Sequence, residues 1–276
     1  MTQQKIWFIT GCSTGFGREL VQVVAEQGHI AVGTVRREEQ VADLEALNPE
    51  SIKGVVLDVT KTIDQAVKTV IDKFGRIDVL VNNAGYGSLG AIEEVPEAEM
   101  RKQFEVNVFG AVFMIKAVLP IMRGQRSGHI LNVTSIAGLQ GYPGVGIYNG
   151  SKFALEGIGE ALAAEVEHLG IKVTNVEPGP FRTDWAGRSA TFTENSIEDY
   201  AASAGRNMNN IHNVSGNQAG DPRKAAEAMY ALTELEKPPV HLPLGGPAYK
   251  RVRLKLKEMA KEVDAFEHIG LPTDFD

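Results

Sequence analysis

The sequence predicts an α/β fold, a doubly wound parallel sheet with helices on both faces. Short apolar runs typical of strands alternate with amphipathic stretches typical of helices over residues 1–180. A length of 276 residues suits one open α/β domain, and 43% hydrophobic with 23% charged residues is an ordinary globular composition. We therefore expect a single domain spanning residues 1–276.

Each expected strand is a short run rich in Val, Ile and Leu. These runs are Ile6–Thr10, Ile30–Val35, Gly54–Leu57, Val79–Val81, His129–Val133, Lys172–Val176 and Val240–Leu244. Each expected helix lies between two such runs, and the last one begins with Asp221 as N-cap and Pro222 at its first position. The expected helices are Gly15–Gln27, Glu38–Leu47, Thr62–Phe74, Ala98–Met122, Tyr148–Leu169 and Pro222–Leu235.

Residues 183–220 interrupt this alternation with a stretch rich in Ser, Asn, Thr, Gly and Ala. Because a structureless loop of this length is uncommon in a compact domain, we expect short helices that form a mobile lid over the site. The alternative is a disordered surface insertion.

A C-terminal extension covers about residues 246–276, and its first part, Ala248–Val263, reads as an amphipathic helix with many cations. We expect this helix to pack on the parent domain or on a neighbouring subunit. A calmodulin-like or membrane-surface helix is the alternative. The cations are Lys250, Arg251, Arg253, Lys255 and Lys257.

Charge and cysteine content exclude several classes of protein. A formal net charge of −7 predicts no binding to nucleic acid or to an anionic membrane. No apolar run approaches the roughly 20 residues of a membrane-spanning helix. With Cys12 as the only cysteine, no internal disulfide can form, and we expect a cytoplasmic protein. The histidines show no metal-ligand spacing, so we expect no metal and structural or solvated roles for His29, His129, His168, His212, His241 and His268.

A glycine-rich run joins the first expected strand directly to the first helix. Glycines allow a tight turn and a close approach to a pyrophosphate, and the helix N-terminus offers unpaired N–H groups. We therefore expect a nucleotide here, the alternative being a simple tight turn. Cys12 lies within the run, where a helix-terminal thiol can be redox-sensitive or can simply pack as a small side chain. The run is Thr10-Gly11-Cys12-Ser13-Thr14-Gly15-Phe16-Gly17.

The end of the second expected strand distinguishes between the two nicotinamide nucleotides. An acidic side chain there would bind the adenosine ribose and repel a phosphate, whereas an arginine accommodates the 2′-phosphate. The run here is Val35-Arg36-Arg37, with no carboxylate before Glu38. We therefore expect NADP(H) to be preferred, with NAD(H) as the second cofactor. The alternative is that the arginines only cap the strand in solvent.

Tyr148 lies thirteen residues after Ser135, and Lys152 follows Tyr148 by four residues in an expected helix. Residues at this spacing share a helix face, so the ammonium is expected beside the phenol and is expected to lower the phenol pKa. Such a tyrosine suits general acid/base catalysis. The alternative is a pair of ordinary amphipathic helix residues.

The ordered set of motifs resembles the short-chain dehydrogenase/reductase family over roughly residues 5–245. The resemblance implies a Rossmann-type sheet with strand order 3-2-1-4-5-6-7. It rests on the glycine-rich run and on further motifs in matching order: Asp58-Val59-Thr60, Asn82-Asn83-Ala84-Gly85, Asn107, Ser135, Tyr148, Lys152, Pro178-Gly179 and Thr183.

The resemblance also assigns roles to these residues. Asp58 and Val59 would contact the adenine, Asn83, Ala84 and Gly85 would shape the cofactor cleft, and Pro178, Gly179 and Thr183 would hold the nicotinamide. The catalytic tetrad would be Asn107, Ser135, Tyr148 and Lys152, where Asn107 holds a water linked to Lys152. Phe16 departs from the small aliphatic residue that is common in the family.

The resemblance implies an NADP(H)-dependent oxidoreductase that interconverts a ketone or aldehyde and an alcohol, and a homo-oligomer, either a dimer or a tetramer. Its subgroup is similar to bacterial hydroxysteroid and retinol dehydrogenases, which favours a small hydrophobic substrate. The alternatives are a catalytically silent nucleotide-binding redox sensor and a dehydratase or epimerase of the same fold. Besides Ser135 and Tyr148, the candidate substrate contacts are Tyr86, Leu89, Leu139, Tyr142, Val145, Trp185 and Phe192.

Overall fold

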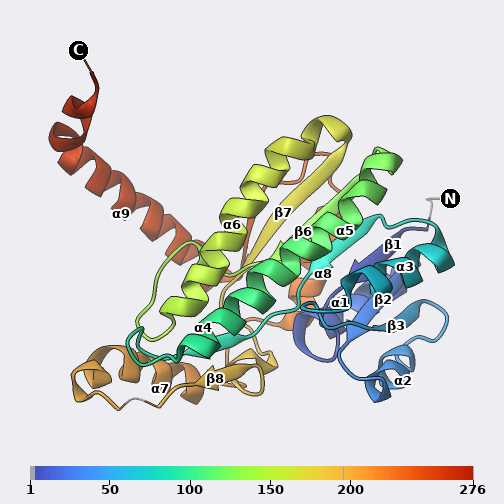
Figure 1. Ribbon diagram of the computed structural model, residues 1–276, viewed down its shortest axis with the longest axis horizontal. Helices are drawn as coiled ribbons and strands as arrows, with labels where there is room; N and C mark the ends of the chain where they lie inside the picture. Colours follow the sequence, from blue (N-terminus) through green and yellow to red (C-terminus); the bar gives the residue numbers. More distant parts are fainter. Residues whose placement is uncertain (1–3, 195, 276) are drawn as a thin grey trace.

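The computed structural model describes residues 4–194 and 196–275, and its centre is a seven-stranded parallel sheet (Figure 1). The strand order is β3-β2-β1-β4-β6-β7-β9. Two short strands, β5 (Gly87–Leu89) and β8 (Ala190–Phe192), lie outside this sheet. If they are not counted, the order is the expected 3-2-1-4-5-6-7. The strands are β1 (Ile6–Ile9), β2 (Ile30–Val35), β3 (Ile52–Val56), β4 (Val79–Asn82), β6 (Gly128–Val133), β7 (Ile171–Pro178) and β9 (His241–Leu244).

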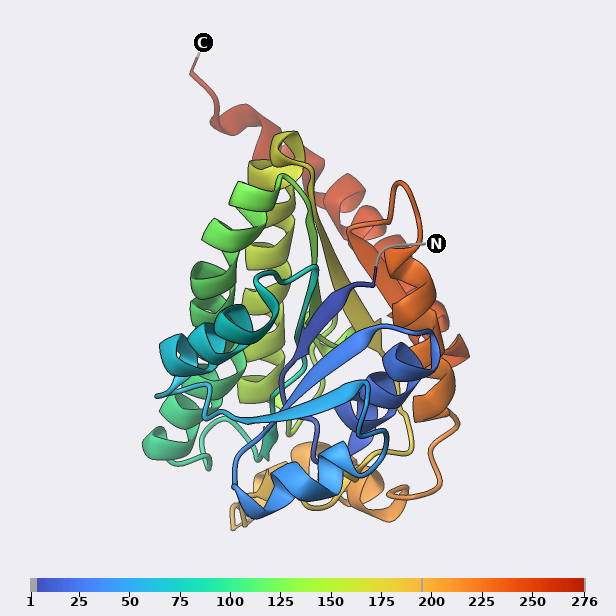
Figure 2. The same ribbon diagram turned by 90° about the vertical axis from the view of Figure 1, so that its right-hand side faces the viewer.

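Helices cover both faces of the sheet, as Figure 2 shows from the side. One face is covered by α1 (Gly15–Glu26), α2 (Glu39–Glu45) and α8 (Pro222–Thr233), and the other by α3 (Ile63–Phe74), α5 (Gly110–Gln125) and α6 (Gly146–Val166). In β1, Trp7 packs into the first layer and Phe8 into the second, and both are fully buried. Strands covered on two sides need apolar residues on both faces, which explains their unbroken apolar runs.

The helix expected over Ala98–Met122 is not continuous. The structure has α4 (Glu97–Phe104), a π-helical turn (Glu105–Phe109) and then α5. A π-helical turn inserts an extra residue into the helical ladder and is frequent at functional sites. Periodicity alone did not reveal it, because the apolar pattern continues through the turn.

The combined helical run Glu97–Gln125 is long and apolar enough to cross a membrane by length and composition, with a mean hydropathy of 1.7 over its most apolar window. This differs from the expectation that no run approaches that length. Met114, Val118 and Met122 on this run are fully buried against the sheet. A core helix of a globular protein passes the same length and composition test.

The segment 183–220 contains short helices, as expected, in its described residues. They are two 3-10 turns (Asp184–Ala186 and Glu198–Tyr200), a π-helical turn (Ala201–Gly205) and α7 (Arg206–Asn213). A small second sheet, in which β5 (Gly87–Leu89) pairs with β8 (Ala190–Phe192), was not expected from the sequence. Strands of three residues carry too little alternation to be recognised.

The C-terminal helix α9 (Gly246–Gly270) is longer than expected and projects away from the rest of the chain (Figures 1 and 2). Ala248 is fully buried, whereas every residue from Leu256 to Phe275 is exposed. The expectation that this helix packs on the parent domain is therefore wrong beyond its first turns.

Candidate active site

The glycine-rich loop after β1 is held in place by residues that follow β4. The Asn83 side-chain amide donates to the carbonyls of Thr10 and Gly11, both at 2.9 Å, and the Thr10 hydroxyl accepts from the backbone N–H groups of Asn83 and Ala84. A Cβ on Gly17 would lie 2.5 Å from the Gly11 carbonyl oxygen, so only glycine fits there. The loop is thus a rigid part of the fold.

This loop has the geometry of an anion cradle. Gly11 and Gly15 adopt positive φ angles of 71° and 60°, which strongly favour glycine. The N-cap residue Thr14 makes no side-chain hydrogen bond to the first turn of α1. The first N–H groups of α1 therefore remain available to a phosphate, and the positive end of the helix dipole favours its charge.

The cradle forms one end of a cleft of about 1150 Å³ that runs along the carboxyl ends of the strands. Ligands of doubly wound α/β proteins bind at this edge of the sheet. Most of the expected cofactor residues line the cleft: Gly11, Ser13, Thr14, Gly15, Phe16, Arg36, Asp58, Val59, Asn83, Ala84, Gly85, Tyr148, Lys152, Pro178, Gly179 and Thr183. The set fits an elongated dinucleotide.

Two expected cofactor residues do not line the cleft. Gly17 is buried beneath the loop, where its role is close packing. The Arg37 guanidinium lies 3.2 Å from Glu39, and both side chains are 67% exposed. Of the two arginines after β2, only Arg36 therefore faces the cleft.

Asp58 lies near Arg36 on the same side of the cleft. Burial acts to raise its pKa, but hydrogen bonds from the backbone N–H and the hydroxyl of Thr60, at 3.0 and 2.7 Å, outweigh burial and lower the pKa below its usual value. The positive charges of Lys61 and Arg36 act in the same direction. Asp58 is therefore a fixed carboxylate that can accept a hydrogen bond from a base or sugar.

Ser135, Tyr148 and Lys152 meet at the other end of the cleft. Ser135 follows β6, and its hydroxyl oxygen accepts from the backbone N–H of Ala137 at 3.0 Å. Tyr148 and Lys152 lie in the first turns of α6 and are each 6% exposed. The Lys152 ammonium donates to the Val133 carbonyl at 2.8 Å and lies 5.8 Å from the centre of the Tyr148 ring.

Burial dominates the protonation of this group. It raises the pKa of Tyr148 to about 12, although a hydrogen bond with Ser135 acts to lower it. Burial also lowers the pKa of Lys152 to about 8, although the negative charge of Glu156 acts to raise it. The Lys152 ammonium by itself therefore does not lower the pKa of Tyr148 below its usual value, because burial of the phenol raises this pKa by more than the neighbouring groups lower it.

Asn107 lies in the π-helical turn between α4 and α5 and is 2% exposed. Its side-chain oxygen accepts from the Tyr86 N–H at 3.1 Å, and its amide donates to the Tyr86 carbonyl at 2.9 Å and to the Ser151 hydroxyl at 3.3 Å. Asn107 does not line the cleft itself. It instead joins the loop after β4 to α6.

The 183–220 segment forms one wall of the cleft beside Tyr148. Trp185 packs on Tyr148, with ring centres 5.0 Å apart. A Cβ on Gly87 would lie 2.7 Å from the indole ring, so a glycine in β5 makes room for it. The wall beside Tyr148 is therefore aromatic.

The expected substrate residues divide into two groups. The members that line the cleft are Tyr86, Ser135, Tyr142, Val145, Tyr148 and Trp185. The members that do not line the cleft are Leu89, Leu139 and Phe192. Leu89 is fully buried, and Phe192 is 37% exposed and packs edge-on against His212.

Helix α9 also contributes to the cleft, which was not expected from the sequence. Pro247 and Arg251, from the first turns of α9, line the cleft, and the Arg251 guanidinium lies 6.0 Å from the centre of the Tyr142 ring. A basic amphipathic pattern gives no sign of which cation faces a site formed by distant segments.

Cys12 is fully buried behind the cradle. Its thiol donates to the Ile9 carbonyl at 3.2 Å, and burial raises its pKa to about 12. Cys12 therefore packs as a small side chain, and the redox-sensitive alternative is wrong because the thiolate form is suppressed.

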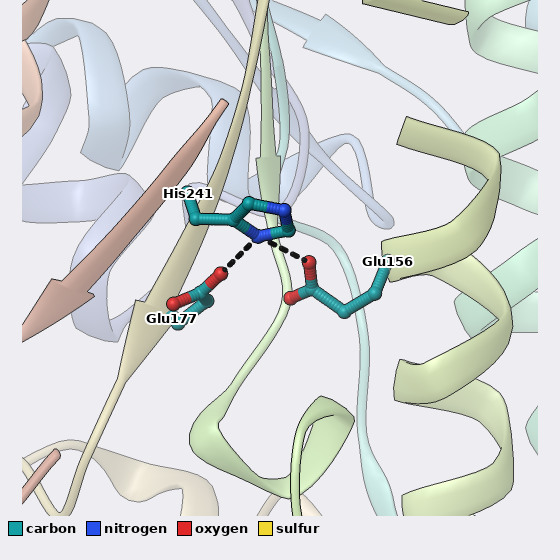
Figure 3. A group of neighbouring side chains, drawn as sticks. All are labelled: Glu156, Glu177 and His241. Carbon is teal, nitrogen blue, oxygen red and sulfur yellow. Dashed lines mark hydrogen bonds and ion pairs between the residues drawn. The ribbon is translucent and has the colours of Figure 1, made fainter. Parts of the chain in front are cut away.

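Glu156, Glu177 and His241 form a second polar group, which joins α6, β7 and β9 (Figure 3). His241 Nδ1 lies 2.7 Å from Glu177 Oε1 and 3.5 Å from Glu156 Oε2, and both glutamates are buried. One donor atom from each lies within 4.8 Å of the others, a spacing that a metal ion can bridge. Because His241 already pairs with both carboxylates, we describe the group as a hydrogen-bonded ion cluster. Its members are far apart in sequence, so spacing did not reveal it.

This cluster predicts a specific pH dependence of stability. Burial and the charge of Glu156 raise the pKa of Glu177 from 4.5 to about 7, so the folded chain binds this proton more tightly than the unfolded chain. The free energy of unfolding should therefore fall as pH rises from about 4.5 to above 7. In Glu177→Gln this contribution disappears, and the difference in unfolding free energy between mutant and wild type should change by about 3 kcal/mol across that range.

Urea denaturation at a series of pH values measures this difference. Glu160→Gln is the matched control, because Glu160 Oε1 lies 3.4 Å from His241 Nε2 but its side chain is 57% exposed. Parallel stability curves for wild type and Glu177→Gln would contradict the assignment of a raised pKa to Glu177.

Comparison with known proteins places this site in a family. A family profile described as short chain dehydrogenase matches residues 5–194. The chain is 42% identical over 246 residues to a 3-ketodihydrosphingosine reductase of Bacteroides thetaiotaomicron, a match that covers 88% of each protein. A crystal structure of a short-chain dehydrogenase from Streptomyces avermitilis superimposes with a TM-score of 0.93 at 39% identity, covering 99% of this chain and all of that one.

A third similar protein is ElxO, whose structure with NADP bound has a TM-score of 0.74 and 26% identity, with 90% of this chain and 100% of that chain covered. The profile match alone extends over more than half of the chain, and the bacterial reductase matches most of its length. The protein therefore belongs to the short-chain dehydrogenase/reductase family and is an oxidoreductase.

Proposed function

We propose that the protein interconverts a hydrophobic ketone or aldehyde and the corresponding alcohol, with NADP(H) as the preferred cofactor. The observation that carries the proposal is that Ser135, Tyr148 and Lys152 line the same cleft as the glycine cradle. A nicotinamide cofactor whose phosphates lie in the cradle would supply the hydride. The protein must then orient the substrate carbonyl and manage one proton.

The positions of Ser135 and Tyr148 suit these two tasks, orientation of the carbonyl and transfer of the proton. The Ser135 oxygen accepts from Ala137 and its hydroxyl lies beside Tyr148, so its proton can be donated to a carbonyl oxygen bound next to both residues. Tyr148, with a pKa of about 12 before ligands bind, is protonated at neutral pH and can donate its proton as an acid in the direction of reduction. We assign these two residues to orientation and proton transfer, respectively.

Lys152 and Asn107 support Tyr148. The Lys152 ammonium uses one of its three N–H donors on Val133, so two remain for ribose hydroxyls. A Cβ on Gly85 would lie 3.1 Å from Asn107 Oδ1 and 3.8 Å from Lys152 Nζ, so the two groups are neighbours. We propose that Asn107 holds a water that connects Lys152 to solvent.

The cofactor preference rests on Arg36. Arg36 lines the cleft directly after β2, at the strand end where an acidic residue would repel a 2′-phosphate. The NADP complex of ElxO supports the same choice. We propose NAD(H) as the weaker cofactor.

The substrate class rests on the wall around Tyr148. Tyr86, Tyr142, Val145 and Trp185 surround the reaction centre with largely apolar surface. The 3-ketodihydrosphingosine reductase among the relatives is named for a lipid ketone, which supports a hydrophobic carbonyl substrate. We propose that the substrate is a small hydrophobic ketone or aldehyde, or the corresponding alcohol.

An absorbance assay tests the proposal with a panel of aliphatic, aromatic and sterol-like ketones and alcohols, each with NADPH, NADH, NADP and NAD. We expect turnover of hydrophobic members, faster with the phosphorylated cofactor. Tight nucleotide binding without turnover of any member would instead favour a nucleotide-binding sensor.

A further inference from the structure

Helix α9 presents an apolar surface that nothing in the described part of the chain covers. Leu256, Met259, Val263 and Phe266 are 61%, 52%, 65% and 61% exposed, respectively. Exposing so many large apolar side chains along one element is costly in water. Scattered exposed residues need no explanation, but these four follow a regular spacing.

These four residues continue a heptad seam that begins with the exposed Tyr249 and the half-buried Val252. Tyr249, Val252, Leu256, Met259, Val263 and Phe266 follow one another at intervals of three, four, three, four and three residues. This is the a/d pattern of a coiled coil, in which an average period of 3.5 keeps a narrow stripe facing a second helix. The seam therefore matches another helix of the same kind better than a flat surface.

The charges beside the seam change sign along the helix. Arg253 and Lys255 flank its first half, and Glu262 and Glu267 occupy the equivalent flanking positions in its second half. Antiparallel pairing that places Arg253 of each helix opposite Glu267 of the other forms this ion pair twice, and it brings one pair of like charges together, Glu262 and its own copy near the centre. In a parallel pair, Glu262 of one copy would face Glu267 of the other, which is repulsive.

A lipid surface fits this helix less well. An interfacial helix has a wide apolar face with cations along its polar face. The second half of α9 instead carries Glu258, Glu262, Asp264 and Glu267, which an anionic membrane repels.

We propose that α9 pairs in antiparallel orientation with α9 of a second copy of this chain. The register that places Arg253 opposite Glu267 also places the small residue Ala260 opposite its own copy at the centre. This inference goes beyond the proposed function, because it concerns assembly. The first turns of the same helix contribute Pro247 and Arg251 to the cleft, so the paired helix is continuous with one wall of the cleft.

Sedimentation equilibrium of the full chain tests the pairing. Leu256→Glu/Val263→Glu introduces charges into the seam at exposed positions, so the fold of the domain is not at risk. We expect the wild type to dimerise and this variant to have a dimer dissociation constant raised by about 100-fold or more. Leu254→Glu is the matched control, since Leu254 is 41% exposed on the same helix but lies outside the seam.

A monomeric wild type overturns the proposal, and so does a dimer that the seam variant leaves intact. Co-sedimentation of wild-type chain with vesicles of phosphatidylcholine and phosphatidylserine supplies the lipid comparison. Vesicle binding that the seam variant loses, without self-association in solution, would overturn the proposal in favour of a membrane surface.

Cross-linking tests the orientation. The single native cysteine, Cys12, is buried, so cysteines introduced on α9 are the accessible thiols. Arg253→Cys and Glu267→Cys proteins are treated with a short bifunctional maleimide, separately and after mixing. An antiparallel pair cross-links the mixture faster than either protein alone, whereas faster cross-linking within each protein alone would overturn the proposed orientation.

Discussion

Tyr148→Phe is expected to reduce turnover by at least about 10³-fold while nucleotide affinity stays nearly unchanged. The substitution removes only the hydroxyl that would carry the proton, and it keeps the ring that packs on Trp185 at 5.0 Å. The cradle and Arg36 lie at the other end of the cleft, so their contacts with a nucleotide do not depend on this hydroxyl. Steady-state assays and fluorescence titration with NADPH measure the two effects.

Tyr142→Phe is the matched control for this experiment. Tyr142 lines the same cleft, and its buried hydroxyl has no hydrogen-bond partner among the described residues. We expect this substitution to affect KM more than kcat, because the hydroxyl is not placed to transfer a proton. A Tyr148→Phe enzyme that keeps most of its turnover would refute the acid/base assignment.

Arg36→Asp is expected to raise the KM for NADPH by about 100-fold and to reverse the preference towards NADH. The change removes a guanidinium that can form charge-assisted hydrogen bonds with a 2′-phosphate, and it adds a carboxylate that repels the phosphate. The same carboxylate can accept hydrogen bonds from the ribose hydroxyls of NADH. The ratio of kcat/KM for the two cofactors is the measurement.

Arg37→Asp separates this specific contact from a general effect of charge. Arg37 is the adjacent residue, but it pairs with Glu39 and does not line the cleft. We expect its substitution to leave the cofactor ratio within a few-fold of the wild type. Equal effects of the two substitutions would show that preference depends on the net charge of the region and not on Arg36.

Much of the fold could be predicted from the sequence because parallel strands buried on both faces leave unbroken apolar runs. In β2 (Ile30–Val35), the expected and observed bounds agree completely. The π-helical turn at Glu105–Phe109 and the three-residue strands β5 and β8 could not be predicted. These elements depend on contacts between distant segments, and their local sequences carry no distinctive period.

Ser135, Tyr148, Lys152 and the cradle were identified from the sequence, since short spacings and a strand-turn-helix context determine where these side chains lie. The cleft contacts of Arg251 required the structure, because α9 follows the reaction centre by about a hundred residues. The cluster of Glu156, Glu177 and His241 likewise joins three separate elements.

The order of the elements and the glycine-rich turn after β1 could be predicted from the sequence alone, and so could the nearness of Tyr148 and Lys152, because each depends on residues close together in the chain. The tertiary structure decided which of Arg36 and Arg37 faces the cleft and the direction of the pKa shift of Tyr148. It also decided that α9 projects from the domain with its seam exposed. These features depend on burial, and burial is set by the packing of segments that are distant in the sequence.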